Sequence, residues 1–442
     1  MSGRPKSKAL YERALKLFPS GVTHDTRHLV PFPIYVNEAK GSRKWDVDGN
    51  EYIDYAMGHG ALLLGHGREE IVKAVRETLV KGTHYGASSE LEVKWAELVK
   101  KLVPCAERVK FTNSGTEATL LALRLARLYT KRDKIIKFQG HFHGWQDYMA
   151  VGEKPPWDLP PPGVPEGVVN TVVVLPCDLA KVEAALSGRD IAAVILEPTG
   201  GSWAKMPLPE DFLKELRGLT KKHDTLLIFD EVVTGFRWSP GGAQGFYGVE
   251  PDITTLAKIL AGGLPGGAVV GREEILKLLE FKKDKGRNRR NKIAHHGTFN
   301  ANPLSAAAGI ACLEIVKSGE PQGEASERTS RLRKSLNGVI NRLEVKGCVY
   351  GESSVFHILL GASPPGGIKE DIRNPGLSVE VLKMGVDPQI NRLFQLSMLI
   401  EGVDIFHMGG LLSSVHTDED IEKTKEAFRR TIGRLRGEGI QI

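Results

Sequence analysis

The 442-residue chain has little cysteine, only 7% aromatic residues and no long apolar run. Its four cysteines lie far apart, without the pairing or histidine spacing of a disulfide framework or a zinc site. We therefore expect reduced thiols, no metal and a cytoplasmic location. No apolar segment approaches the length of a membrane-spanning helix, and Met1–Phe18 lacks the apolar centre of a signal peptide. These absences predict a protein without a membrane partner.

The chain also has only a small excess of positive charge. The chain has 60 Lys and Arg against 54 Asp and Glu, a net charge of +6, which is low for a nucleic-acid-binding protein. Nucleic acid is therefore not an expected partner. One dense basic cluster, Lys282–Lys292, is predicted to be a solvated surface loop, with contact to an anionic partner as the alternative.

Short apolar runs alternate with helical segments from about residue 90 onward. Runs of this length and composition are typical of buried strands. Strands that alternate with helices predict an α/β fold with a mostly parallel sheet covered on both faces. The strand candidates are Val109–Thr112, Ile135–Phe138, Val172–Leu175, Ile191–Leu196, Leu226–Phe229, Ile253–Ala257 and Gly267–Val270.

The pattern predicts three segments along the chain. Residues 1–65 contain a helix and a β-meander, and residues 66–322 form a large domain. Residues 323–442 are richer in helix, and we expect them to form a smaller α+β domain that includes the N-terminal segment. The proline-rich stretch Lys154–Gly163 is long for a loop inside a compact domain, which suggests a mobile cover over an active site.

Polar residues follow several strand candidates directly, where ligands of open α/β sheets bind. Ser114 and Glu117 form an S-x-x-E capping box, yet the same helix N-terminus would also bind a phosphate, and the two interpretations remain equally open. Asp230 ends an apolar strand. A helix N-cap is its commoner role, although a desolvated carboxylate would need a cation or a donor.

Lys258 follows the apolar run Ile253–Ala257 and precedes a glycine-rich turn. A lone lysine at a strand end usually extends its ammonium into solvent. If the ammonium is buried, its pKa falls and the amine becomes a nucleophile toward carbonyls. A phosphate site, a carboxylate for a ring nitrogen and an imine-forming lysine together match one cofactor, pyridoxal 5′-phosphate.

Five motifs, in this order, resemble the class III aminotransferase family of fold type I. Within the family, the similarity is greatest to the glutamate-1-semialdehyde aminomutases and the β-amino-acid aminotransferases, and it covers nearly the whole chain. The resemblance implies a large domain with a mostly parallel central sheet and a smaller α+β domain. The motifs are Asn113–Ala118, His141–Gly144, Asp230–Arg237, Thr255–Lys258 and Gly297–Pro303.

The resemblance implies roles around the cofactor ring. Lys258 would form the Schiff base and then transfer the proton, and Asp230 would keep the pyridine nitrogen protonated. Phe142 would stack on one face of the ring and Val232 would pack on the other, although both are also compatible with the core. Glu197 would lie near the cofactor, without an assigned role.

The resemblance also implies contacts at the two ends of the bound molecules. Ser114, Gly115 and Thr116 would bind the phosphate together with Thr298 of the partner subunit, which implies a homodimer with shared active sites. Arg27 would bind the substrate carboxylate, for which a planar guanidinium is well suited; the alternative is a surface arginine. His59, His84 and His143 are treated as structural histidines.

The chain departs from its relatives at three positions. Phe142 replaces a tyrosine found in many members, and Val233 replaces a glutamine that many transaminases carry. Met408 stands where the aminomutases carry an acidic residue, which weighs against mutase chemistry.

The leading hypothesis is a ping-pong transaminase that acts on an α- or β-amino acid or a related amine and a keto acid. The alternative is a glutamate-1-semialdehyde 2,1-aminomutase, which moves the amino group within one molecule. Racemase or decarboxylase activity and a non-catalytic cofactor-binding regulator remain minor alternatives.

Overall fold

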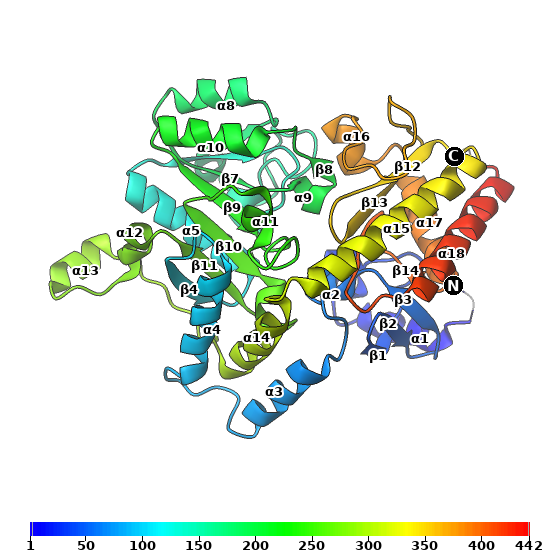
Figure 1. Cartoon of the computed structure of the whole chain (residues 1–442), viewed down its shortest axis with the longest axis horizontal. Coiled ribbons are helices and arrows are strands. Elements are labelled where there is room, and N and C mark those ends of the chain that lie inside the picture. The colour runs from blue at the N-terminus through cyan, green and yellow to red at the C-terminus, as the bar shows by residue number, and fades with distance from the viewer. Residues whose placement is uncertain (2, 441) are drawn as a thin grey trace. The chain divides into compact units, whose positions relative to one another are not determined.

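The computed structural model describes residues 1, 3–440 and 442 and divides into two units. Unit 1 comprises Met1–Arg68, Gly323–Leu377 and Met384–Ile442, and unit 2 comprises Glu69–Gln322 and Ser378–Lys383 (Figure 1). The short segment Ser378–Lys383 thus belongs to unit 2, whereas the sequence analysis places it in the C-terminal domain.

Unit 2 is built on a seven-stranded sheet with the order β4-β11-β10-β9-β7-β5-β6. β11 is antiparallel to both of its neighbours, and the pairs from β10 to β6 are parallel. The predicted mostly parallel sheet and all seven of its strands are therefore confirmed. The strands are β4 Arg108–Thr112, β5 Lys134–Phe138, β6 Val172–Leu175, β7 Ile191–Leu196, β9 Leu226–Glu231, β10 Ile253–Ala257 and β11 Gly267–Gly271.

Two apolar cores cover the two faces of this sheet, because successive strand residues point to opposite sides. Ile228 packs in the core that contains α5 (Gly115–Thr130), whereas Leu227 and Phe229 pack in the core beneath α8 (Leu179–Leu186) and α10 (Phe212–Lys222). Helices α8 and α10 lie side by side in Figure 1. Burial on both faces explains why these strands are almost wholly apolar.

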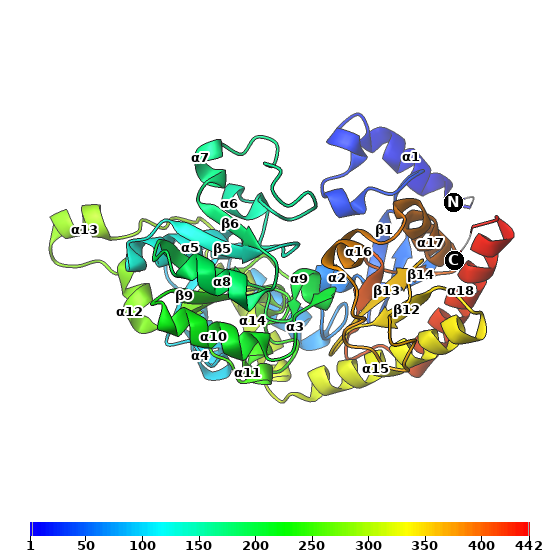
Figure 2. The same ribbon diagram turned by 90° about the horizontal axis from the view of Figure 1, so that it is seen from above.

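The other elements of unit 2 surround this three-layer body. The basic cluster contains a helix, α13, where a loop was predicted, and both views show it extending away from the rest of unit 2 (Figures 1 and 2). These elements are α3 Glu69–Leu79, α4 Glu90–Leu102, α6 Asp147–Ala150, α7 Glu166–Val169, α9 Gly201–Ala204, β8 Met206–Pro207, α11 Gly242–Tyr247, η3 Lys258–Ala261, α12 Glu273–Leu276, η4 Lys277–Leu279, α13 Lys285–Asn291 and α14 Pro303–Val316. Most of α16 (Val379–Met384) also lies in this unit.

Unit 1 contains two small sheets and one apolar core shared by its strands and helices. The first sheet has the order β1-β2-β3-β14 and contains the predicted meander, and the second has the order β12-β13-β15. Among the described residues, no helix is long and apolar enough to cross a membrane. The elements are α1 Pro5–Ala14, η1 Pro19–Gly21, η2 Asp25–Arg27, β1 Val36–Lys40, β2 Arg43–Asp46, β3 Glu51–Asp54, α2 Met57–Gly60, α15 Glu320–Arg342 (which begins in unit 2), β12 Gly347–Tyr350, β13 Val355–Leu360, α17 Pro388–Ile400, β14 Val403–Asp404, β15 Gly409–Leu411 and α18 Asp418–Gly437.

Candidate active site

Lys258 lies immediately beyond the carboxyl end of β10. It is half-buried and adopts a left-handed backbone conformation with φ of 54°, which is uncommon for a residue with a side chain. Burial lowers the pKa of its amine, opposed by the charges of Asp230 and Glu197. A strained backbone and a destabilised ammonium at one position are typical of functional sites.

Asp230 lies near the carboxyl end of β9, at the same edge of the sheet as Lys258, because Thr255 of β10 pairs with it in parallel register. Its Oδ1 accepts hydrogen bonds from the Val232 amide at 3.0 Å and the Thr255 hydroxyl at 3.2 Å. Burial raises the pKa of Asp230 to about 6. The carboxyl group is thus held rigidly in an environment that favours a cationic partner.

His143 contacts Asp230 from another part of the chain. Its Nδ1 lies 2.7 Å from Asp230 Oδ2, and burial holds its pKa well below the usual range. A neutral imidazole in this position donates Nδ1–H to the carboxylate. A structural role was expected for His143, whereas in the structure it contacts the carboxylate of Asp230. Its position directly after Phe142 in the His-Phe-His-Gly motif was the available signal.

The turn before α5, which was predicted to bind a phosphate, is capped by Ser114 and closely packed. Ser114 is the N-cap, and its hydroxyl accepts from the Glu117 amide at 3.2 Å. The Glu117 carboxylate accepts from the Asn113 amide at 2.8 Å and not from Ser114, so only half of the predicted capping box forms. A Cβ on Gly115 would come within 2.7 Å of Val232, and one on Gly144 within 2.5 Å of the Thr116 hydroxyl. Only glycine allows these two close approaches, because any Cβ would overlap the neighbouring side chain.

Glu197 binds three backbone amides from two segments. Its Oε1 accepts from Phe142 at 3.0 Å and Ser202 at 2.8 Å, and its Oε2 accepts from Trp203 at 2.8 Å. Burial raises the pKa of Glu197 to about 7. A buried carboxyl group that joins two loops fixes their separation.

Phe142 differs from the residues on either side of it. Its side chain is 48% exposed, whereas His141 and His143 are each 1% exposed. An aromatic face left open between two buried histidines suits stacking against a flat ring. Together with Lys258 and Asp230, this arrangement fits a pyridine cofactor.

Three further residues from the sequence analysis contact residues other than those around Asp230. Thr298 is an exposed residue of unit 2, and its carbonyl oxygen accepts a hydrogen bond from His84. Arg27 is an exposed residue of unit 1, and its guanidinium donates to the Thr23 hydroxyl at 3.1 Å. Met408 is 4% exposed and packs in the core of unit 1.

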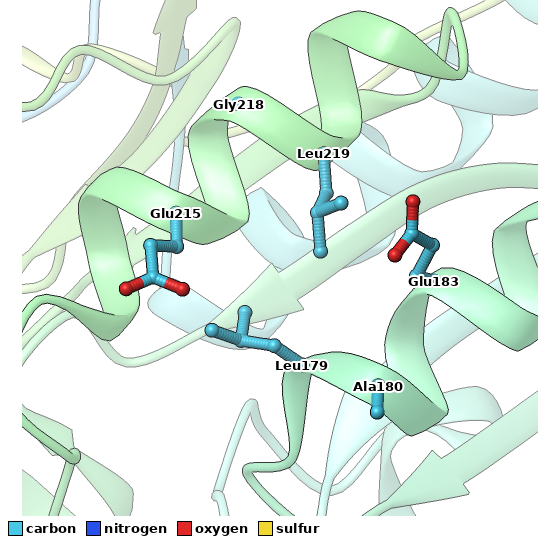
Figure 3. A pocket seen from close by; sticks show the side chains of 6 residues that line it. All are labelled: Leu179, Ala180, Glu183, Glu215, Gly218 and Leu219. Atoms are coloured by element: carbon cyan, nitrogen blue, oxygen red, sulfur yellow. The ribbon is translucent and has the colours of Figure 1, made fainter.

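A surface groove elsewhere in unit 2 contains none of the predicted site residues. It lies between α8 and α10 and has a volume of about 440 Å³ (Figure 3). Its lining residues are Leu179, Ala180, Glu183, Glu215, Gly218 and Leu219. The candidate active site is therefore defined by its side-chain contacts and not by this groove.

Comparison with known proteins identifies the family. The family model described as aminotransferase class-III matches residues 25–352. The chain belongs to this family. It is 39% identical to the glutamate-1-semialdehyde 2,1-aminomutase of Methanopyrus kandleri over 98% of each chain.

Solved structures confirm the fold type. An omega-transaminase from Sphaerobacter thermophilus is 33% identical with a TM-score of 0.86 over 98% of each chain. A glutamate-1-semialdehyde-aminomutase from Pseudomonas aeruginosa PAO1 in complex with PMP is 26% identical with a TM-score of 0.86, over 98% of this chain and 95% of that one. The chain is therefore a fold type I, class III enzyme with pyridoxal 5′-phosphate as its cofactor, as predicted.

Proposed function

We propose that the chain is a glutamate-1-semialdehyde 2,1-aminomutase, which moves an amino group between neighbouring carbons of one substrate. The observation that supports amino transfer is the arrangement of Lys258 and Asp230 at one sheet edge, with His143 bound to the carboxylate. The choice of aminomutase is supported by the full-length relative that bears this name at 39% identity. This reverses the order of the two hypotheses in the sequence analysis.

Bound pyridoxal phosphate supplies an electron-accepting ring that stabilises negative charge on a substrate carbon. Asp230 holds a proton on the ring nitrogen, and His143 keeps the carboxylate oriented toward it. The Lys258 amine removes and returns a proton at the substrate carbon, for which a lowered pKa is favourable. Phe142 would cover a ring face, and the first turn of α5, with Ser114, Gly115 and Thr116, would hold the phosphate.

The core position of Met408 removes one argument against this proposal. The sequence analysis counts Met408 against mutase chemistry because the aminomutases carry an acidic residue there. In the structure the side chain packs with the apolar core of unit 1. Burial explains an apolar residue at this position, so we give Met408 little weight in choosing between the two reactions.

Transamination between two molecules is the second candidate. The 33% identity and TM-score of 0.86 with the omega-transaminase favour it. The two reactions differ in one requirement, since a transaminase needs a separate amino acceptor.

The decisive experiment measures 5-aminolevulinate formed from glutamate-1-semialdehyde with and without an added keto acid. We expect formation without the keto acid by the wild-type chain and none by Lys258→Ala, the inactive control. Product that appears only when a keto acid and an amine donor are present would favour transamination. Absence of 5-aminolevulinate under both conditions would refute the aminomutase proposal.

Arg27 is proposed to bind the substrate carboxylate. Arg27→Ala should raise KM for carboxylate substrates by roughly tenfold or more, because a guanidinium–carboxylate contact contributes about 1.5–3 kcal/mol. The half-reaction with a simple amine that lacks a carboxylate should change little. Rates measured with both donors check this, and an equal loss for the two would exclude the contact.

A further inference from the structure

The segment Ser378–Lys383 belongs to unit 2, although the chain directly before and after it belongs to unit 1. Glu380 Oε1 accepts a hydrogen bond from Trp157 Nε1 at 3.1 Å, and the carbonyl of Lys383 accepts from Lys205 Nζ at 2.9 Å. These contacts hold α16 against loops that follow β5 and β7. These specific hydrogen bonds indicate that the short segment has a defined role in unit 2.

The side chain of Lys383 supplies the central contact. Its Nζ donates to the carbonyl oxygen of Gly140 at 2.8 Å and lies 3.2 Å from the hydroxyl of Ser202. Gly140 has a left-handed φ of 77°, and a Cβ there would meet the sulfur of Met206 at 2.7 Å. The backbone at Gly140 is therefore closely packed by Met206, and the Lys383 side chain lies beside it.

The two partners of Lys383 belong to the two segments that Glu197 also joins. Gly140 is two residues before Phe142, whose amide binds Glu197, and the amide of Ser202 binds the same carboxylate oxygen. Glu197 and Lys383 thus cross-link the same pair of loops at different points. The doubly linked segment continues into His143, which contacts Asp230.

We propose that Lys383 is a positioning residue for the cofactor: by holding Gly140 and Ser202 together, it fixes the loop that presents Phe142 and His143 to the pyridine ring. The effect passes through Gly140 and Ser202, and Lys383 itself does not act on the substrate. It applies to aminomutase and transaminase chemistry alike, since both use the same cofactor site.

The environment of Lys383 supports a dedicated contact over a general surface charge. Burial lowers the pKa of its amine, opposed by the charges of Glu153 and Glu197. Removing an ammonium group from water costs free energy that the bonds to a carbonyl and a hydroxyl offset. A lysine needed only for solubility would remain solvated, as the exposed Lys181 on α8 does.

The test compares Lys383→Met, which keeps the apolar stem, with Lys383→Arg, which keeps the charge and donors. Lys181→Met is the matched control on the surface of unit 2. Each purified apo-protein is titrated with pyridoxal phosphate, and the visible circular dichroism of the bound cofactor is recorded. Cofactor affinity and visible dichroism do not depend on which substrate the enzyme uses. A negative result here would therefore count against the role of Lys383 and not against the proposed function.

We expect Lys383→Met to bind the cofactor roughly tenfold more weakly, as loss of an outer contact to a ligand-binding group does, and to weaken the visible dichroism. Lys383→Arg should recover part of both signals, and Lys181→Met should match the wild type. Wild-type affinity and dichroism in Lys383→Met would overturn the proposal, and so would a lowered Tm without a change in either signal. If Lys383→Met does not fold, Ser202→Ala removes one of the two acceptors, and unchanged dichroism there would also overturn it.

Discussion

At the scale of single residues, the cofactor site depends on side chains removed from water. Asp230 and Glu197 have raised pKa values, and Lys258 has a lowered one, in each case with burial as the largest cause. Hydrogen bonds from backbone amides, the Thr255 hydroxyl and His143 partly compensate the buried carboxyl groups for the loss of water. Burial costs stability in the apo-protein, and under the proposed function a bound cofactor would offset that cost by bringing a cation to Asp230.

The stability of the apo-protein should record the titration of Asp230. Its pKa rises from an ordinary value of 3.8 to about 6 on folding, so the folded state binds more protons in this range. Stability therefore falls as pH rises from about 4 to about 6 and stays lower above that window. Asp230→Asn removes this titration and should gain up to about 3 kcal/mol relative to the wild type across the window.

Urea unfolding of the two apo-proteins at a series of pH values between 4 and 7 measures this difference. A stability difference that does not change with pH would contradict the raised pKa. The same variant should lower the rate of amino transfer by about 100-fold or more, because a neutral amide cannot hold the ring nitrogen protonated.

At the scale of elements, the site exists because strand ends meet helix starts at one edge of the sheet. β9 ends in Asp230 and Glu231, and β10 ends just before Lys258. The start of α5 approaches this edge closely enough for Gly115 to contact Val232. The packing of elements therefore depends on the absence of a Cβ at this glycine.

Gly115→Ala should displace the start of α5. Its Cβ would lie 2.7 Å from Val232, which costs about 1–3 kcal/mol of stability and should weaken cofactor binding. Gly218→Ala is the matched control on α10, where a Cβ meets nothing within 4 Å. That change should stabilise by about 0.5–1 kcal/mol because it reduces the entropy of the unfolded chain.

Urea unfolding and cofactor titration of both variants check this pair. Equal effects of the two substitutions would show that close packing at the start of α5 does not matter to the site.

At the scale of the whole molecule, we propose a homodimer in which Thr298 binds the phosphate in the partner's site. Thr298 and Phe299 are exposed in the single chain, and Phe299 is 58% exposed although it is aromatic. Exposed aromatic residues beside a motif that carries function are typical of an interface.

Mixing two inactive or weakened variants tests the shared site. A dimer of one Lys258→Ala chain and one Thr298→Ala chain would contain one site with both native residues if Thr298 acts across the interface. We therefore expect cofactor affinity in that site to exceed that of the Thr298→Ala dimer, measured after the subunits are mixed and the mixed dimer is isolated. Equal affinity would place Thr298 in its own chain's site, and a monomeric protein in sedimentation would exclude the dimer.

The sequence by itself determined the sheet and its seven strands, because burial on both faces produces apolar runs that are visible locally. The cofactor followed from the polar residues directly after those strands. The ordered motifs added the family. The local pattern also misled at one point, because a helix forms within Lys282–Lys292 where a loop was predicted.

Only the tertiary structure decided which side chains support one another. His143 lies 87 positions before Asp230, and Lys383 lies 243 positions after Gly140, yet each pair is in hydrogen-bond contact. No local periodicity encodes such contacts, because they depend on how separate segments meet at the sheet edge. Glu197 likewise received a place near the cofactor from the sequence, but its three backbone donors appear only when the loops after β5 and β7 are brought together.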